Sequence, residues 1–335
     1  MLPAWLRTQI KKEGGWMPWH DVMAAALYNP EHGYYMQHVT LGERGDFVTA
    51  PSLTLAFGAC VGQWVLKMWR ALGQPAAFVL CEFGAGEGQL LQGLLAELNK
   101  TEAGQACRKA AHVHIVEISP RLQAAQQEKL KEEGVIWCEE SALPTNAPLV
   151  VLANEVLDAF PVHILRKKEG EWEEEGLNEQ GETLWRPCEA VEGWQHIKDG
   201  AIVEISEAQE AFVKRLSARI NTQKGAVWLA DYGYESLPPE GGETLQAVKG
   251  HKKISRGESV GEADITAHVD FGRVAAWLGK RTVLKNQADW LLAHGMLERG
   301  HEMLAAGEED ALHRLLHPAR MGRLFKVLEY GPCLG

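Results

Sequence analysis

The sequence predicts an α/β fold built on a doubly wound, mostly parallel sheet. Between residues 75 and 160, short apolar runs alternate with stretches of helical periodicity. This alternation is typical of βαβ units, in which a helix crosses over the sheet between two parallel strands. A glycine-rich stretch follows the first apolar run, as expected where a strand turns tightly into a helix. The 335 residues are enough for such a sheet and for an added lobe.

The pattern of apolar periodicity along the chain divides it into three parts. Residues 1–74 are the first part. This part is expected to be an N-terminal extension of helices and one long loop. It begins with a short amphipathic helix and continues with helices predicted over residues 19–28 and 56–72. The loop lies between them, at residues 33–51, and is rich in glycine.

The second and third parts, residues 75–160 and 161–335, are expected to share the core sheet. In the second part, apolar periodicity predicts strands at 76–81, 112–116, 135–138 and 149–153, and helices at 89–99 and 120–133. The third part predicts an inserted antiparallel lobe with strands at 162–168, 171–177 and 182–185. It continues with a helix at 204–220, strands at 226–230 and 245–248, a helix at 271–278 and a last strand at 324–328. The predicted domain is therefore a parallel core sheet with an α+β lobe inserted in it.

Composition favours an ordinary globular protein. Hydrophobic residues make up 46% of the chain and charged residues 24%. No run of 18 apolar residues occurs, so no membrane span is predicted. The N-terminus lacks the order of a secretory signal, and six scattered cysteines indicate reduced thiols. We therefore expect a cytoplasmic protein.

Charge and cysteine spacing restrict the kinds of partner. The formal net charge of −11 argues against a broad nucleic-acid surface but tolerates a basic peptide or protein partner. No CxxC pair and no His/Cys cluster with ligand spacing occurs, so no metal site is predicted. The sequence leaves the oligomeric state open.

The glycine loop after the first predicted strand is the sharpest local signal. It reads EFGAGEG, with Glu82 before Gly84, Gly86 and Gly88. Glycines let the backbone approach a ligand closely, and the following helix offers free N–H groups. A dinucleotide loop would have Gly-x-Gly-x-x-Gly spacing, and acidic residues would repel its pyrophosphate. The loop therefore favours a cationic, phosphate-free nucleoside over a nicotinamide cofactor, although a nicotinamide-dependent oxidoreductase stays open as an alternative.

Two further strand ends carry polar side chains. Glu117 ends the second predicted strand, about 30 residues after the loop, where a carboxylate can accept hydrogen bonds from ribose hydroxyls. Asn154, Glu155 and Asp158 follow the fourth strand and face the crevice above the sheet. On a helical turn Glu155 and Asp158 would share a face and form a pair of carboxylates for a cationic nucleophile. The plainer interpretation is an ordinary helix start with an Asn cap.

Several segments taken together resemble the MidA-like family of S-adenosylmethionine-dependent methyltransferases, which includes a mitochondrial arginine methyltransferase that assists assembly of a respiratory complex. The matching segments are HGYY (32–35), GERGDFVTAP (42–51), FG (57–58), EFGAGEGQLL (82–91), VEISPRLQAAQ (116–126), ANEVLDAFPVHIL (153–165), LADYGY (229–234), TLQAVKGHK (244–252) and GEADITAHVDF (261–271). They run in order over most of the chain, and GDFVTAP, NEVLDAFPVH and ADITAHVDF are more specific than the glycine loop.

The resemblance implies a Rossmann-like methyltransferase core, S-adenosylmethionine as cofactor and arginine methylation of a protein substrate, such as a respiratory-complex subunit. It implies that the three loop glycines line the methionine part beside Glu82 and that Glu117 and Asn154 also contact the cofactor. Ser141 and Ala142 would lie near adenine.

At the acceptor side, the resemblance implies catalytic roles for Asp46, Asn154, Glu155 and Asp158, with Asp46 closing from the loop at 42–51. Two positions depart from the family pattern, because Ser52 and Ala59 stand where members commonly have Glu. These departures keep a non-catalytic, S-adenosylmethionine-binding assembly factor open as a second alternative.

Overall fold

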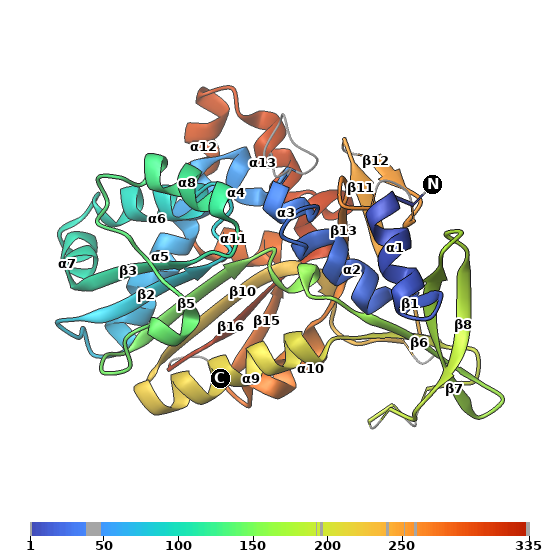
Figure 1. Ribbon diagram of the computed structural model, residues 1–335. Helices are drawn as coiled ribbons and strands as arrows, with labels where there is room; N and C mark the ends of the chain where they lie inside the picture. The colour runs from blue at the N-terminus through green and yellow to red at the C-terminus, as the bar shows by residue number, and fades with distance from the viewer. Residues whose placement is uncertain are drawn as a thin grey trace.

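An eight-stranded sheet forms the centre of the protein (Figure 1). The structure is a computed structural model that describes residues 2–37, 48–191, 193–194, 197–238, 241–250, 252–257 and 260–332. Along the sheet the order is β15 (Thr282–Asn286), β16 (Phe325–Tyr330), β10 (Gly225–Tyr234), β5 (Leu149–Asn154), β2 (Phe78–Phe83), β3 (Ala111–Val116) and β4 (Ile136–Trp137), and β14 (Val269–Asp270) pairs with β10.

The chain reverses its direction of travel across the sheet between β2 and β5. Strands β2, β3 and β4 follow one another outward, and β5 then returns to the other side of β2. These pairs are parallel, as is β5 with β10, whereas β16 is antiparallel to both of its neighbours. The predicted doubly wound α/β sheet is confirmed, and the reversal between β2 and β5 is a topological switch point where such sheets bind ligands.

Helices cover both faces of this sheet (Figure 1). One face packs against α5 (Leu55–Ala71), α6 (Gln89–Leu98) and α7 (Glu102–Ala110). The other packs against α9 (Glu207–Gln223) and α10 (Phe271–Leu278), while α8 (Pro120–Lys129) follows β3. Strand β2 shows why: Phe78 and Leu80 enter the first core cluster, and Val79 and Cys81 enter the second. Such a strand reads as a continuous apolar run because both of its faces are buried.

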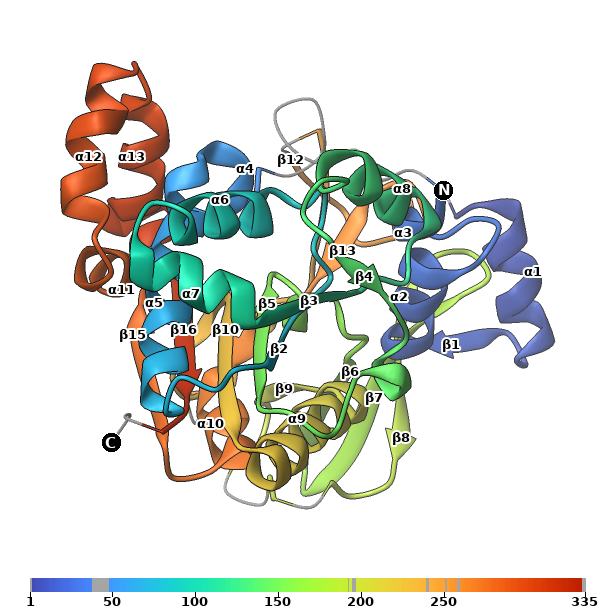
Figure 2. The same cartoon turned by 90° about the vertical axis from the view of Figure 1, so that its left-hand side faces the viewer.

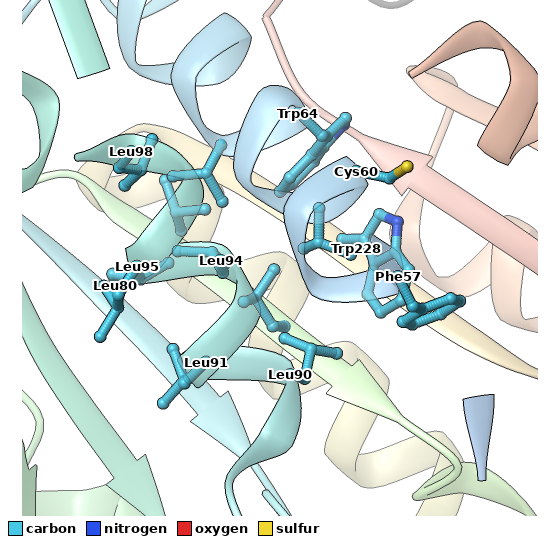
Figure 3. Packing of buried hydrophobic residues seen from close by; sticks show 14 of the residues in the cluster. Phe57, Cys60, Trp64, Leu80, Leu90, Leu91, Leu94, Leu95, Leu98 and Trp228 are labelled. Atoms are coloured by element: carbon cyan, nitrogen blue, oxygen red, sulfur yellow. The ribbon is translucent and has the colours of Figure 1, made fainter. Parts of the chain in front are cut away.

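Helices α5 and α6 approach each other closely through glycines (Figure 3). A Cβ atom added to Gly58 would lie 2.5 Å from the carbonyl oxygen of Leu90, and one added to Gly93 would lie 2.4 Å from that of Leu55. Large side chains such as Trp64 fill the space around this contact. The glycine loop leads directly into α6. The contact between α5 and α6 therefore also helps to hold this loop in place.

The antiparallel lobe lies beside the core and includes the N-terminal segment (Figure 1). It contains β1 (Trp16–Pro18), β6 (His163–Lys168), β7 (Glu171–Asn178), β8 (Thr183–Cys188) and β9 (Ile202–Ile205), and a second small sheet of β11 (Gln246–Lys249), β12 (Lys252–Ile254) and β13 (Asp264–Thr266). Helices α1 (Ala4–Lys12), α2 (Trp19–Tyr28) and α3 (Tyr34–Gln37) complete it. Leu6 and Val22 share one apolar cluster with Ile164 and Ile265. The N-terminal helices and the two sheets of the lobe therefore pack around one core.

Several helices were absent from the sequence prediction. They are α3 and α4 (Ala50–Leu53), which both overlap the loop predicted at 33–51, α7, α11 (Gln287–Ala293), α12 (Met296–Ala305) and α13 (Glu309–Leu316), with short turns η1 (Glu140–Ala142), η2 (Leu157–Ala159) and η3 (Pro318–Gly322). Figure 2 shows α12 and α13 standing side by side at one end of the molecule. Helix α5 falls inside the expected N-terminal part, yet it packs on the core. Within the part of the chain that is described, no helix has the length and apolarity to cross a membrane.

The glycine contact gives a stability prediction. We expect Gly58→Ala to lower the free energy of unfolding by about 1–3 kcal/mol, because the added methyl group has no room against the backbone of α6. Urea unfolding followed by circular dichroism measures the change. Gly242→Ala is the matched control, because a Cβ atom there meets nothing within 4 Å. Equal stability of the two variants would contradict the close approach of α5 and α6.

Candidate active site

A cavity of about 480 Å³ opens at the carboxyl ends of β2, β3 and β5, at the switch point of the sheet. The residues predicted from the sequence that line it are Glu82, Gly84, Gly86, Glu117, Asn154, Glu155 and Asp158. The structure therefore brings together side chains from three strand ends, as expected for parallel strands whose carboxyl ends meet at one edge.

The glycine loop adopts backbone conformations that favour glycine. Gly84, Gly86 and Gly88 have φ angles of +58°, +55° and +85°. A Cβ atom on Gly84 would also lie 2.9 Å from Val156 Cγ2. Gly84 and Gly86 line the cavity, whereas Gly88 is the residue before α6 and packs against Leu130 instead. Contact of Gly88 with the cofactor therefore stays a prediction, and its left-handed φ places it in the tight turn before α6.

Glu82 is a buried acid facing the cavity. It is 2% exposed, and its Oε2 atom has no hydrogen-bond partner among the described residues. Burial, together with the charge of Glu117, raises the pKa of Glu82 to about 8. A ligand that brings a cationic N–H donor would satisfy this oxygen and favour the ionised carboxylate.

Glu117 follows β3 and is held by its neighbours. Its Oε1 accepts a hydrogen bond from the Ser119 backbone N–H at 2.9 Å, and its Oε2 accepts one from Gln126 Nε2 at 2.9 Å. Burial raises the pKa of Glu117, although these hydrogen bonds oppose the rise. Each carboxylate oxygen keeps a second lone pair for a ligand hydroxyl. The fixed geometry suits the two hydroxyls of a ribose.

The turn that carries Ser141 and Ala142, which were predicted to lie near adenine, reaches the cavity through the preceding residue. Ser141 and Ala142 are absent from the described lining of the cavity, but Glu140, on the same turn η1, is part of it. Glu140 Oε2 lies 3.0 Å from Arg215 Nη2, and Arg215 also lines the cavity from α9. Sequence reasoning missed this pair because its members come from elements far apart in the chain.

Glu155 reaches the cavity by a different route from the one predicted. The sequence suggested a helical turn that aligns Glu155 with Asp158, but Glu155 has a left-handed φ of +53° and only Leu157–Ala159 form a turn of helix. Such a conformation costs a non-glycine residue about 1–3 kcal/mol and is typical of functional positions. Glu155 Oε1 accepts hydrogen bonds from Asn154 Nδ2 at 3.1 Å and from the Ala50 N–H at 3.3 Å. Burial and the nearby Asp158 raise the pKa of Glu155 to about 8.

Asp158 is positioned by a residue that the sequence analysis did not select. Asp231, at the cavity end of β10, is fully buried, and its Oδ2 accepts hydrogen bonds from the backbone N–H groups of Leu157 (3.0 Å) and Asp158 (3.1 Å). Burial raises the pKa of Asp158 to about 6, although a hydrogen bond from Tyr232 opposes the rise. Burial and the neighbouring carboxylates also raise the pKa of Asp231. An acid at the end of the apolar run 226–230 was the signal available in the sequence.

The N-terminal extension supplies the remaining wall. Tyr28 and Tyr35 line the cavity with their rings stacked at 5.9 Å between centroids. The Tyr28 hydroxyl donates to the Ala159 carbonyl at 2.7 Å, and the Tyr35 hydroxyl lies 3.2 Å from both carboxylate oxygens of Asp264. These contacts join the N-terminal extension to turn η2, which carries Asp158, and to β13.

The family resemblance also singles out Asp46, Ser52 and Ala59 in the N-terminal part of the chain. Asp46, predicted to be catalytic, lies outside the described residues. Ser52 and Ala59 are described, and neither belongs to the lining of the cavity, whereas Thr49 and Pro51 do. The departures at positions 52 and 59 therefore leave the described part of the cavity lining unchanged.

Unpartnered acceptor atoms indicate the chemistry of the ligand. Glu82 Oε2, Asn154 Oδ1 and Asp158 Oδ1 are buried and find no donor among the described residues. Buried acceptors of this kind are normally satisfied, so a ligand rich in N–H and O–H donors is expected here. S-adenosylmethionine fits, because it carries an ammonium group, ribose hydroxyls and a sulfonium but no phosphate that would be repelled by these acids.

The fold and this acid-lined cavity define an S-adenosylmethionine-dependent methyltransferase. A family model described as "Putative S-adenosyl-L-methionine-dependent methyltransferase" matches residues 60–287, and the chain belongs to this family. The resemblance found in the sequence motifs is thereby confirmed, and the nicotinamide-dependent alternative is not supported.

Known relatives agree with this assignment. The chain is 30% identical to the protein arginine methyltransferase NDUFAF7 homolog of Drosophila melanogaster, over 98% of this chain and 84% of that protein. It is 28% identical to NDUFAF7 of Xenopus tropicalis, over 93% and 81%. Among solved structures, a superfamily member from Burkholderia thailandensis bound to S-adenosyl-homocysteine has a TM-score of 0.82 and 29% identity, over 98% of this chain and 91% of that one.

The expected cytoplasmic location is contradicted by these comparisons. Both NDUFAF7 proteins are named as mitochondrial. The expectation rested on the N-terminus and on scattered cysteines, and reduced thiols do not distinguish between compartments inside a cell.

The buried acid at the end of β2 gives a binding prediction. Replacing Glu82 by Gln removes the negative charge with little change in shape. We expect the Kd for S-adenosylmethionine to rise about 10- to 100-fold, because a charge-assisted hydrogen bond is lost. The wild-type affinity should increase as the pH rises toward about 8, since only the ionised carboxylate pairs fully with an ammonium group.

Isothermal titration calorimetry at several pH values measures both effects. Glu128→Gln is the control, because Glu128 is exposed on α8, away from the cavity. An unchanged Kd in the Glu82 variant, with the same pH dependence as the wild type, would remove Glu82 from the binding site.

Proposed function

We propose that this protein transfers a methyl group from S-adenosylmethionine to the guanidinium group of an arginine in a protein substrate. The observation that carries the proposal is the pair of carboxylates in the cavity wall, the buried Asp158 and the half-buried Glu155, beside the carboxyl ends of β2 and β5. The names of the curated relatives, which are protein arginine methyltransferases, support it. When bound, the cofactor supplies an electrophilic methyl group attached to a sulfonium.

The acidic residues have a clear task in such a reaction. A guanidinium has a pKa above about 12, so it enters the cavity protonated and without a free lone pair. Glu155 and Asp158 would orient it by charge-assisted hydrogen bonds and concentrate positive charge on the nitrogens that do not react. The attacking nitrogen loses a proton as its new bond to carbon forms, and Glu155 is suited to accept it because its pKa of about 8 is near working pH.

The surrounding residues position these groups and exclude water. Asn154 holds Glu155 by a hydrogen bond, and Asp231 holds the turn that carries Asp158. The stacked rings of Tyr28 and Tyr35 cover the same region. Alignment of nucleophile and methyl group in a dry site is the main source of catalysis in a displacement of this kind. Asp46, in the loop at 42–51, would add a further carboxyl group beside Glu155 and Asp158.

The proposed substrate class rests on the family resemblance seen in the sequence motifs. The family resemblance includes an arginine methyltransferase that assists assembly of a respiratory complex, so we propose a respiratory-complex subunit as the substrate. Residues 1–74 would then cover the active site, residues 75–160 bind the cofactor, and the lobe within residues 161–335 contact the substrate protein. The acidic net charge of −11 favours a basic segment around the target arginine.

The proposed general base gives a prediction on activity. We expect Glu155→Gln to lower kcat about 10²- to 10⁴-fold while the Kd for S-adenosylmethionine changes little, because Glu155 acts on the acceptor. In the wild type, kcat/KM for the substrate should increase as the pH rises through about 8, since Glu155 is protonated below its raised pKa.

Transfer of a radiolabelled methyl group to the purified substrate measures both quantities. Glu302→Gln, which changes an exposed acid on α12, is the control and should keep full activity. Unchanged methyl transfer by the Glu155 variant would exclude this residue from the chemistry.

The substrate class can be tested on the whole set of proteins in a cell extract. We expect the purified protein and radiolabelled S-adenosylmethionine to label a specific protein in an extract from a strain that lacks this gene. Mass spectrometry should then identify methylarginine in that protein, and the Glu155→Gln variant should label it far less. Tight cofactor binding without labelling of any protein would favour the alternative of a non-catalytic assembly factor.

A further inference from the structure

The cavity holds more negative charge than the cofactor would neutralise. Acidic residues outnumber basic ones in its described lining, where Arg215 is the one cation and already pairs with Glu140 at 3.0 Å. The cofactor would use Glu82 for its ammonium group and Glu117 for its ribose. Asp264, the first residue of β13, is a further acid of the same lining and is 7% exposed.

Strand β13 is fastened to the turn that carries Asp158. The backbone N–H of Ala267, just after β13, donates a hydrogen bond to the Asp158 carbonyl oxygen at 3.0 Å. The Tyr232 hydroxyl forms hydrogen bonds with Thr266 of β13 and with the Asp158 side chain. Asp158 and Asp264 therefore reach one cavity from two elements that are joined to each other, although they lie far apart in the chain.

Two tyrosines of the N-terminal extension lie beside both acids. The Tyr35 hydroxyl is 3.2 Å from each carboxylate oxygen of Asp264. This distance is long compared with the roughly 2.5–2.7 Å that is usual between a hydroxyl and an ionised carboxylate, so Tyr35 orients Asp264 by a weak bond. Burial raises the pKa of Tyr28 and Tyr35, and the charges of Asp264 and Asp158 raise it further. The two carboxylates therefore act on the same space beside the tyrosine rings.

One buried acceptor atom in this space still lacks a donor. Asp158 is 5% exposed, and its Oδ1 atom finds no hydrogen-bond partner among the described residues. Buried acceptors are normally satisfied, so a ligand with several N–H groups is expected here. A guanidinium is planar, offers five N–H donors to carboxylates and stacks on aromatic rings, whereas an ammonium is a compact group with three donors. Two carboxylates beside two aromatic rings match the guanidinium better.

We propose that Asp264 is a specificity-determining residue that binds the guanidinium of the acceptor together with Asp158, against the two tyrosine rings. This inference rests on the proposed function and deepens it, because it names the residue that selects the acceptor. Glu155 then accepts the proton, while Asp264 and Asp158 hold the nitrogens that do not react. The ammonium of a lysine has too few donors and the wrong shape to satisfy both carboxylates and stack, so the site disfavours it.

Binding of butylguanidine to the full-length protein, saturated with S-adenosyl-homocysteine, tests the proposal. We expect the wild type to bind butylguanidine about tenfold or more tightly than butylamine, because the ammonium lacks the planar set of donors. Asp264→Asn should raise the Kd for butylguanidine about 10- to 100-fold, since a charge-assisted hydrogen bond is lost. The Kd for S-adenosyl-homocysteine should stay unchanged, which shows that the variant is folded. Ligand-observed NMR titrations measure these values.

Two further variants separate direct contact from support of the fold. Tyr35→Phe removes the hydroxyl that touches Asp264 but keeps the ring and the carboxylate. We expect it to change the Kd for butylguanidine much less than Asp264→Asn does. Glu262→Gln is the matched control and should bind as the wild type, because Glu262 lies two residues before Asp264, has a side chain that is 62% exposed and is absent from the described lining.

Three results would overturn the inference. They are no binding of butylguanidine by the wild type, equal affinity of the wild type and Asp264→Asn, or an equal loss in Asp264→Asn and Tyr35→Phe, which would make Asp264 a support for the ring. None of them bears on the proposed function, which methyl transfer to arginine in the cell extract tests separately. Absence of methylarginine together with weaker butylguanidine binding by Asp264→Asn would refute the proposed function alone and leave the guanidinium site in place.

Discussion

The concentration of buried carboxylates at the ends of the parallel strands is the constraint on which the rest of the structure depends. Glu82, Asp158 and Asp231 are withdrawn from water and Glu155 is half-buried, and burial raises the pKa of each of these carboxyl groups. Burying an ionisable group costs free energy unless it is paired or hydrogen-bonded. Some of this cost is offset by local donors, but buried oxygens of Glu82 and Asp158 find no partner among the described residues. These carboxylates therefore favour the binding of cations where a sulfonium nucleoside and a guanidinium would meet.

Holding these acids in place requires backbone conformations that are rare elsewhere. Gly84 and Gly86 take left-handed angles so that the loop can pass close to the ligand, and Glu155 takes one to direct its carboxylate into the cavity. The close contact between α5 and α6 anchors the helix that follows the glycine loop. The sheet and its helices supply the rigidity, while the strained positions sit at the strand ends where the chemistry is expected.

The lobe and the N-terminal extension add a wall to the cavity at the strand ends. Tyr28 and Tyr35 come from the extension, and Asp264 comes from β13, so this wall is assembled from segments far apart in the chain. Outside the cavity, the ring of His20 from the extension stacks on that of His163 from the lobe, with centroids 4.2 Å apart.

The sequence by itself determined the α/β class, most of the core strands, the glycine loop and the acids at the carboxyl ends of β2, β3 and β5, because these depend on local periodicity and on strand ends. It also indicated the family through motifs such as NEVLDAFPVH. Only the tertiary structure decided that Asp231 supports Asp158, that Gly88 shapes a turn and that Glu155 is not helical. It alone brought His20 to His163 and Tyr35 to Asp264. Such pairs arise from packing between elements far apart in the chain, and residue spacing carries no record of that packing.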